Sequence, residues 1–236
     1  MIKIPTSFIH GLCPGSLLIP VIAILESYCI PEVKLLLQRK GGKRLYIKSL
    51  LVNLQNVVFL GALTYYTAHD HICTDRQLSI PERISCILGI VAIQGVLYFW
   101  IHKSFHEIKS LWWMHRFHHK FNTVVLPSSA NAVSVAEFVF AYMTPLLIGS
   151  AVTRSDIFSA LFATSIIGIA NLLIHFPFLD GQWPVSHESE SSFPTWIFVS
   201  TRDHITHHRH NGNAHYAAPV FHFDRIFSRK KVKFTD

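Results

Sequence analysis

Long apolar segments alternate with shorter polar ones along most of this 236-residue chain. Apolar windows of about 20 residues are long enough to cross the hydrocarbon of a bilayer as helices. Four clear windows are residues 50–68, 84–101, 133–152 and 157–179. A fifth, residues 12–31, is interrupted by Pro14, Pro20 and Glu26, which leaves a kinked span and a helix in the membrane interface both open. The pattern predicts an all-α membrane bundle of four or five transmembrane helices.

Composition and charge agree with a membrane protein. Half of the residues are hydrophobic and 15% are charged, against about 25% charged in soluble domains. If all five windows span, the links between them alternate sides, and residues 32–49, 102–132 and 180–236 share one side with 17 of the 21 Lys and Arg residues. The excess of basic residues places that side in the cytoplasm and the N-terminus outside. Membrane orientation therefore explains the net charge of +7 without nucleic acid as a partner.

The length suits a single membrane-embedded domain over residues 1–236. The four cysteines are far apart and form no CxxC pair. This excludes a zinc knuckle and a dense disulfide framework, so we expect free thiols.

Sixteen histidines are present, and most of them cluster at one predicted face of the membrane. His102 and His106 stand four residues apart at the inner end of the third apolar window, where a helix would point both the same way. Both can therefore bind one metal ion.

Two further clusters share the spacing H-x-x-H-H. In such a triplet the last two side chains diverge by about 100° on a helix, so one triplet can supply ligands to two metals. The two triplets are His115, His118 and His119, and His204, His207 and His208. A ninth candidate, His175, lies near the inner end of the last apolar window.

The number and type of ligands narrow the chemistry. Imidazoles without thiolates suit iron, zinc, copper or nickel. Eight or nine of them exceed what one ion accepts, which favours two neighbouring ions. Zinc peptidase chemistry is disfavoured because "HKSFH" lacks the glutamate of H-E-x-x-H.

The order of these boxes resembles the fatty acid hydroxylase and sterol desaturase superfamily of integral membrane di-iron enzymes. "LWWMHRFHH", "IFVSTRDHITHH" and "FDRIF" are similar to segments of that family, over about residues 95–228. The chain departs from the family pattern at Lys103, where arginine is common, at "NAHYAA", and after Phe227, where no Gly-Thr follows. These departures leave the substrate subgroup open.

The resemblance implies that the nine histidines hold two Fe ions, with O2 as co-substrate. It implies hydroxylation or desaturation of a lipid such as a sterol or a fatty acyl or sphingoid chain. The chain has no Gly-rich dinucleotide fingerprint, so electrons would come from cytochrome b5 or a ferredoxin with its reductase. The active site would face the cytosol, at the endoplasmic reticulum in a eukaryote or the inner membrane in a bacterium.

Other side chains near the boxes are candidates for supporting roles. Carboxylates that could orient the ring N–H groups of the ligands are Glu107, Glu137, Asp203 and Asp224. His215 is a candidate for a further ligand, while surface or supporting positions are expected for His210 and His222. Aromatic residues that would line a lipid path or anchor the chain at the interface are Trp100, Trp112, Trp113 and Phe117.

Three alternatives remain in view. A bis-histidine haem protein would place histidine pairs across membrane-buried helices, whereas here most histidines lie beyond the windows. A metal transporter would carry ionisable residues along its spans, and the last three windows hold few apart from Glu137 and His175. A histidine-rich metal-binding protein without oxygenase activity is the third.

Overall fold

The computed structural model describes residues 6–74, 76–182, 197–209, 215–217 and 219–227. These residues form helices, and their one β feature is an isolated antiparallel bridge between Phe198 and Phe221. Five helical segments are long and apolar enough to cross a membrane: Phe8–Ser27, Gly42–Thr67, Ile80–Glu107, Val135–Thr153 and Ile157–Ile174. The predicted all-α membrane bundle is confirmed, with five candidate spans.

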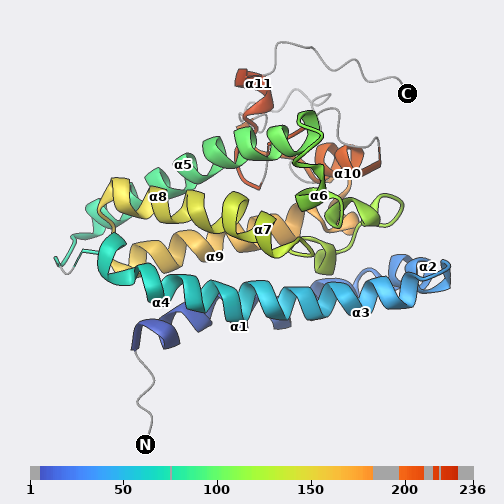
Figure 1. Ribbon diagram of the computed structural model, residues 1–236, viewed down its shortest axis with the longest axis horizontal. Coiled ribbons are helices and arrows are strands. Elements are labelled where there is room, and N and C mark those ends of the chain that lie inside the picture. The colour runs from blue at the N-terminus through green and yellow to red at the C-terminus, as the bar shows by residue number, and fades with distance from the viewer. Residues whose placement is uncertain (1–5, 75, 183–196, 210–214, 218, 228–236) are drawn as a thin grey trace, which may run out of the picture.

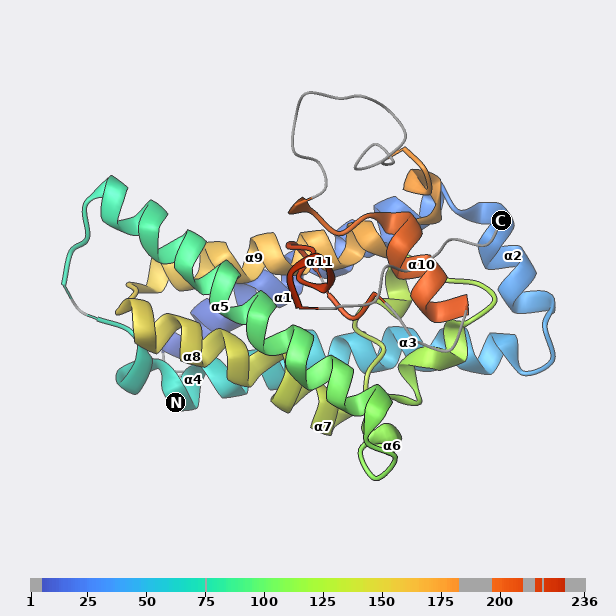
Figure 2. The same ribbon diagram turned by 90° about the horizontal axis from the view of Figure 1, so that it is seen from above.

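The spans pack in two layers (Figure 1). One layer contains α1 (Thr6–Ser27) and a continuous helix made of α3 (Gly42–Asn53), the π-helical turn η1 (Leu54–Leu60) and α4 (Gly61–Ile72). The other contains α5 (Ile80–Glu107), α8 (Thr144–Thr153), which continues from α7 (Val135–Glu137) and η4 (Phe138–Met143), and α9 (Ile157–Ile174). Seen from above, α5 crosses over α8 and α9 (Figure 2), and it packs against both.

Two helix boundaries differ from the sequence prediction in instructive ways. The first span remains helical through Pro14 and Pro20, so the helix over 12–31 is real but begins and ends earlier. The last span ends at Ile174 instead of residue 179. Pro177, which lacks a backbone N–H and restricts the residue before it, accounts for that early end.

Local caps fix where α5 and α9 begin and where α8 ends. Ser79 and Glu82 form a capping box at the start of α5. Asp156 accepts the backbone N–H of Ser159 at 2.9 Å at the start of α9 and also binds Arg83 Nε at 2.7 Å. Arg154 adopts a left-handed conformation with φ of 51°, which closes the tight link between α8 and α9.

The segment of residues 126–133, in which the 3-10 turn η3 (Pro127–Ser129) is the one helical part, is buried between the two layers. Backbone groups in such a place need partners, because an unmatched one costs several kcal/mol in an apolar environment. Side chains of the spans supply these partners: Asn53 donates to Ser128 O at 2.6 Å, Asn56 to Val133 O at 2.9 Å, and Glu26 accepts from Ser128 N at 2.9 Å. The spans thereby hold this segment beneath the histidines.

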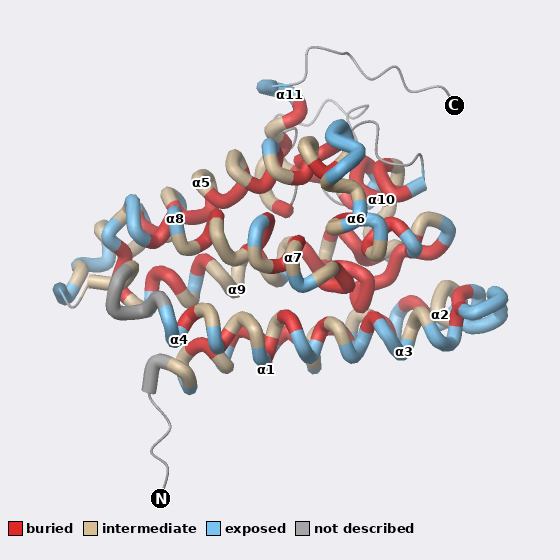
Figure 3. Tube along the Cα trace, in the orientation of Figure 1, coloured by how far each residue is buried: buried red, intermediate tan, exposed pale blue. Residues whose placement is uncertain are grey.

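The histidine boxes gather at one end of the bundle, where several short helices form a cap. The cap contains α6 (Trp112–His115), η2 (His118–Phe121), α10 (Thr201–Arg209) and α11 (Asp224–Phe227), with α2 (Ile30–Gln38) beside it. Many residues of this cap are buried (Figure 3). The four cysteines are free thiols, as predicted.

Candidate metal centre

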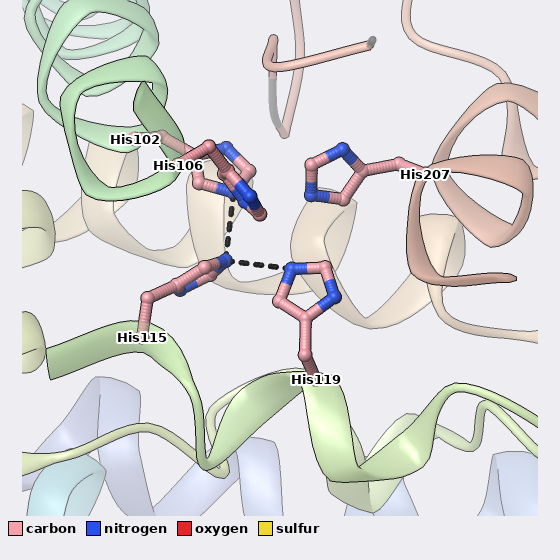
Figure 4. A group of neighbouring side chains, drawn as sticks. All are labelled: His102, His106, His115, His119 and His207. Carbon is pink, nitrogen blue, oxygen red and sulfur yellow. Dashed lines mark hydrogen bonds between the residues drawn. The ribbon is translucent and has the colours of Figure 1, made fainter. Parts of the chain in front are cut away.

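Five histidines from three parts of the chain point toward one another (Figure 4). We call them the five-histidine group: His102 and His106 from α5, His115 from α6, His119 from η2 and His207 from α10. The Nε2 atom of His115 lies 2.9 Å from that of His102 and 2.9 Å from that of His119. The Nε2 atoms of His106 and His102 are 3.2 Å apart.

A second, four-histidine group lies beside the first and is fully buried. It contains His118 from η2, His175 at the end of α9, and His204 and His208 from α10. The Nε2 atom of His175 is 2.9 Å from that of His204 and 3.4 Å from that of His118.

Each H-x-x-H-H triplet contributes to both groups. His118 and His119 point into different groups, as do His207 and His208. The two groups are neighbours, since the rings of His119 and His208 lie 4.9 Å apart between centroids. The divergence of adjacent side chains predicted from the spacing is therefore observed, and the nine candidate histidines form two adjoining sets.

The separations between the ring nitrogens match those around a metal ion. With metal–imidazole bonds of about 2.1 Å, two ligand nitrogens would be about 3.0 Å apart at 90° and about 3.4 Å apart at the tetrahedral angle. The measured Nε2 separations run from 2.9 to 3.4 Å. The residues present therefore fit two imidazole-bound ions.

Backbone carbonyls fix the tautomer of two of these rings. His102 Nδ1 donates to Tyr216 O at 2.8 Å, and His175 Nδ1 donates to Asn171 O at 2.7 Å. Because a carbonyl oxygen can only accept, each Nδ1 carries the proton and each Nε2 presents a bare lone pair to its group. This is the arrangement that ligating histidines show in known metal sites.

Glu137 orients a third ring. Its Oε1 accepts from His115 Nδ1 at 2.6 Å, and neither side chain is exposed by more than 1%. Ser134 caps the short helix that carries Glu137, by accepting its backbone N–H at 3.0 Å. The expected supporting role of Glu137 thus has a direct contact behind it.

Burial favours the neutral form of the histidines in the four-histidine group. It lowers the pKa of His118, His204 and His208 well below the ordinary value, and that of His175 to about 4. Both ring nitrogens of the fully buried His208 lack a hydrogen-bond partner among the described residues. Leaving such a group unsatisfied costs about 1–3 kcal/mol, and a cation bound to one of the two nitrogens would remove the cost at that nitrogen.

The other three candidate carboxylates contact no histidine of the two groups directly. Glu107 is 57% exposed and pairs with Lys103 at 3.8 Å, so the expectation that it orients a ligand is wrong. Asp224 accepts the backbone N–H groups of Tyr216 at 2.9 Å and Ala217 at 2.6 Å. It therefore acts one step away, by holding the backbone whose carbonyl orients a ring of the five-histidine group.

Asp203 belongs to a third buried set with His215 and His222. His222 Nε2 lies 3.3 Å from Asp203 Oδ2, and His215 Nδ1 lies 3.8 Å from Asp203 Oδ1. Burial raises the pKa of Asp203, but the hydrogen bond from His222 and the neighbouring His215 outweigh it and lower the pKa to about 2. His215, a candidate extra ligand, thus lies outside both histidine groups. His210 falls outside the described residues.

The aromatic candidates divide by position. Trp112 packs against the five-histidine group, 5.4 Å between ring centroids from both His106 and His119. Trp100 and Trp113 are about half exposed, at 47% and 52%, as expected of interfacial side chains. Phe117 lies beneath Lys48, whose Nζ is 4.6 Å from the ring centre.

A narrow, mainly apolar cavity of about 80 Å³ lies among the spans. α1, η1, α4, α8 and α9 contribute to its walls, with Tyr142 of η4. The Tyr142 ring lies 5.4 Å from the ring of Tyr98, which lies 5.1 Å from His102. Two tyrosine rings therefore connect the cavity wall to the five-histidine group.

Comparisons with known proteins agree with this geometry. The family model described as fatty acid hydroxylase matches residues 87–229, which include all nine histidines of the two groups. Fatty acid hydroxylase ahd1 of Mycosarcoma maydis is 22% identical over 195 residues, covering 79% of this chain and 45% of that protein. The chain thus spans about half the length of this curated relative. No solved structure matches the present chain.

Proposed function

Because the chain belongs to the fatty acid hydroxylase family, we propose that it is a membrane-bound, O2-dependent lipid hydroxylase with two iron ions held by its nine clustered histidines. The observation that carries this proposal is the pair of adjoining histidine groups with ring nitrogens 2.9 to 3.4 Å apart. Bound iron would supply the activation of O2 that oxidation of an unactivated C–H bond requires.

The protein's own residues would prepare this site. Glu137 and the carbonyls of Tyr216 and Asn171 hold three rings with Nε2 turned inward. Fixed rings limit the rearrangement needed when a metal binds. Complete burial of His102, His115, His118 and the other inner rings excludes bulk water from that side of the site, which protects an oxidation reaction from side reactions.

An apolar lipid fits the surroundings. The apolar cavity of about 80 Å³ among the spans is smaller than a lipid, so a sterol or a fatty acyl or sphingoid chain that approaches from the bilayer by this path would have to widen it. Hydroxylation is favoured over desaturation because it needs one hydrogen abstraction and no second aligned C–H bond. Residues 1–236 contain no Gly-rich dinucleotide fingerprint, so cytochrome b5 or a ferredoxin with its reductase is the proposed electron donor.

The histidine end is proposed to face the cytosol, in the endoplasmic reticulum membrane or a bacterial inner membrane. The count of basic residues on that side supports this orientation. An epitope tag after residue 236 that is accessible only from the outer or lumenal side would contradict it.

Isotope labelling tests the function. Cells with and without the gene are grown under 18O2, and their lipids are profiled by mass spectrometry. One labelled oxygen in a lipid supports hydroxylation, and loss of two hydrogens supports desaturation. His118→Ala and His207→Ala, one from each histidine group, should abolish the product. A purified protein that binds metal but oxidises no lipid with a reductant and donor would support the alternative of a metal-binding or metal-transport protein.

A further inference from the structure

A concave, strongly basic surface lies at the histidine end of the bundle. It is a cleft of about 690 Å³ between the turn that joins α2 to α3 and the η2 segment. Five exposed cations line it, and we call it the basic cleft: Arg39, Lys40, Arg44, Lys48 and Lys120. No acidic side chain is among its lining residues.

The positive charge of the basic cleft is not compensated within the described part of the chain. None of the ion pairs there involves any of the five cations. Arg39 instead donates to the hydroxyl of Thr123 at 2.8 Å, and the ammonium groups of Lys48 and Lys120 lie over the ring of Phe117. Five like charges around a concavity favour an anionic occupant.

The backbone that forms one wall of the basic cleft is tightly constrained. Gly41 has a φ of 76°, a left-handed conformation that glycine adopts without strain. A Cβ atom on Gly42 would stand 1.7 Å from the carbonyl oxygen of Leu36. Only glycine therefore allows this close turn, which presents Arg39, Lys40, Arg44 and Lys48 on one wall.

The base of the basic cleft reaches the candidate metal centre. His119, whose Nε2 lies 2.9 Å from His115 Nε2 in the five-histidine group, also lines the cleft. A ligand bound in the basic cleft is therefore separated from the other four histidines of the five-histidine group by the ring of His119. Neither of the other two described cavities is lined by a residue of the histidine groups.

The position of the basic cleft favours a lipid headgroup over a protein. α3 begins at Gly42 and continues into a membrane span, so the cleft lies at the boundary where headgroups reside. Leu45 and Phe117 add apolar surface beside the cations. A protein partner would need about 800 Å² on each side, whereas a concavity of this size suits one small charged group.

We propose that the basic cleft binds the phosphate headgroup of an anionic lipid and holds it beside the five-histidine group. That this lipid is the substrate rests on the function proposed above. Phosphate oxygens match the lysine and arginine side chains by charge and by hydrogen bonding.

The test measures binding without turnover. The iron-loaded chain in neutral-detergent micelles is titrated calorimetrically with oleoyl lysophosphatidate, oleoyl lysophosphatidylcholine and inorganic phosphate. We expect lysophosphatidate to bind about tenfold or more tightly than either other probe, and its affinity to fall with added salt. The variant Arg44→Gln/Lys48→Gln/Lys120→Gln should lose about tenfold or more in affinity, because each exposed contact contributes a few-fold.

A matched control removes three exposed cations outside the basic cleft: Lys34→Gln/Lys43→Gln/Lys109→Gln. It should bind lysophosphatidate like the unmodified chain, and both variants should keep their iron content and melting temperature. Equal losses in both variants would mean diffuse charge attraction and would overturn the proposal. So would equally tight binding of inorganic phosphate.

A third contrary outcome concerns the electron donor. If the cleft variant keeps lysophosphatidate binding but accepts electrons from reduced cytochrome b5 more slowly, the surface docks an acidic protein instead. The two proposals also fail separately. A chain that binds lysophosphatidate but oxidises no lipid keeps the cleft and loses the hydroxylase. A chain that oxidises neutral lipids but does not bind lysophosphatidate keeps the hydroxylase and loses the cleft.

Discussion

Replacing Glu137 by glutamine isolates the charge of one buried contact from its shape. The Glu137 Oε1 atom accepts from His115 Nδ1 at 2.6 Å, and both side chains are essentially unexposed. Glutamine keeps the volume and an accepting oxygen but cannot carry the negative charge that a cation bound to His115 would stabilise on the carboxylate. Alanine removes the acceptor as well, and leaves the ring N–H buried without a partner.

The magnitude follows from the kind of hydrogen bond. A hydrogen bond to a charged group contributes about 1.5–3 kcal/mol, and one between neutral groups about 0.5–1.5 kcal/mol. The difference of about 1.4 kcal/mol is tenfold in an equilibrium constant. We therefore expect Glu137→Gln to weaken metal binding about tenfold. Glu137→Ala should weaken it by up to about 100-fold, the upper range for losing such a supporting partner.

The assay is iron content per chain, measured by mass spectrometry of the metal after dialysis against graded concentrations of a chelator. Glu107→Gln is the matched control, since it removes one carboxylate that is 57% exposed and pairs with Lys103 at 3.8 Å. The reasoning is refuted if Glu137→Gln retains iron as well as the unmodified chain, or if Glu107→Gln loses as much.

Three further predictions address the rest of the site. His118→Ala and His207→Ala should each lower bound iron by about half, because each removes a ligand from one group only. The control His10→Ala, on α1, should leave the iron content unchanged. An unchanged iron content in His118→Ala or His207→Ala would contradict two separate sites. Asp224→Asn should lower the free energy of unfolding by about 2–3 kcal/mol, because an amide oxygen cannot accept both backbone N–H groups that the carboxylate holds. Thermal melting checks this, and an unchanged melting temperature would show that these two hydrogen bonds do not stabilise the fold. The metal-free protein should lose stability as the pH falls from 6.5 toward 4. Burial lowers the pKa of His175 from 6.5 to about 4, so over that interval the unfolded chain binds a proton that the folded chain does not, a cost on the order of 3 kcal/mol for this group. Melting curves that do not change across this pH range would rule it out.

Hydrophobic periodicity was enough to predict the membrane bundle, and helix boundaries were its weak point. The last four windows were located correctly because each is long and apolar, a local property of the chain. Whether residues 12–31 span could not be decided from the sequence, because Pro14 and Pro20 disfavour an isolated helix and only packing against α4 and α9 restores it. The extension of α5 to Glu107 likewise depends on the packing of His102 and Phe105 in the cap.

The candidate site shows the same division. Spacing alone indicated that His118 and His119 diverge, and the structure places them in different groups. Spacing could not reveal the partners of the ring N–H groups of His102 and His175, because these partners are the backbone carbonyls of Tyr216 and Asn171. Any residue carries a carbonyl, so the side-chain sequence holds no mark of them. Glu107 looked as suitable as Glu137 until its exposure was known.

By itself, then, the sequence determined that the protein is a helical membrane bundle. It also determined which nine histidines are candidate ligands and how they divide among the boxes. These features depend on residue types and on helical periodicity. Tertiary structure alone decided which ring belongs to which group, which carboxylate touches a ligand, and that the α2–α3 turn and α3 place four cations beside His119 and Lys120. The physical reason is distance along the chain. Contacts such as that of His102 with Tyr216, 114 residues apart, form only when the whole bundle packs.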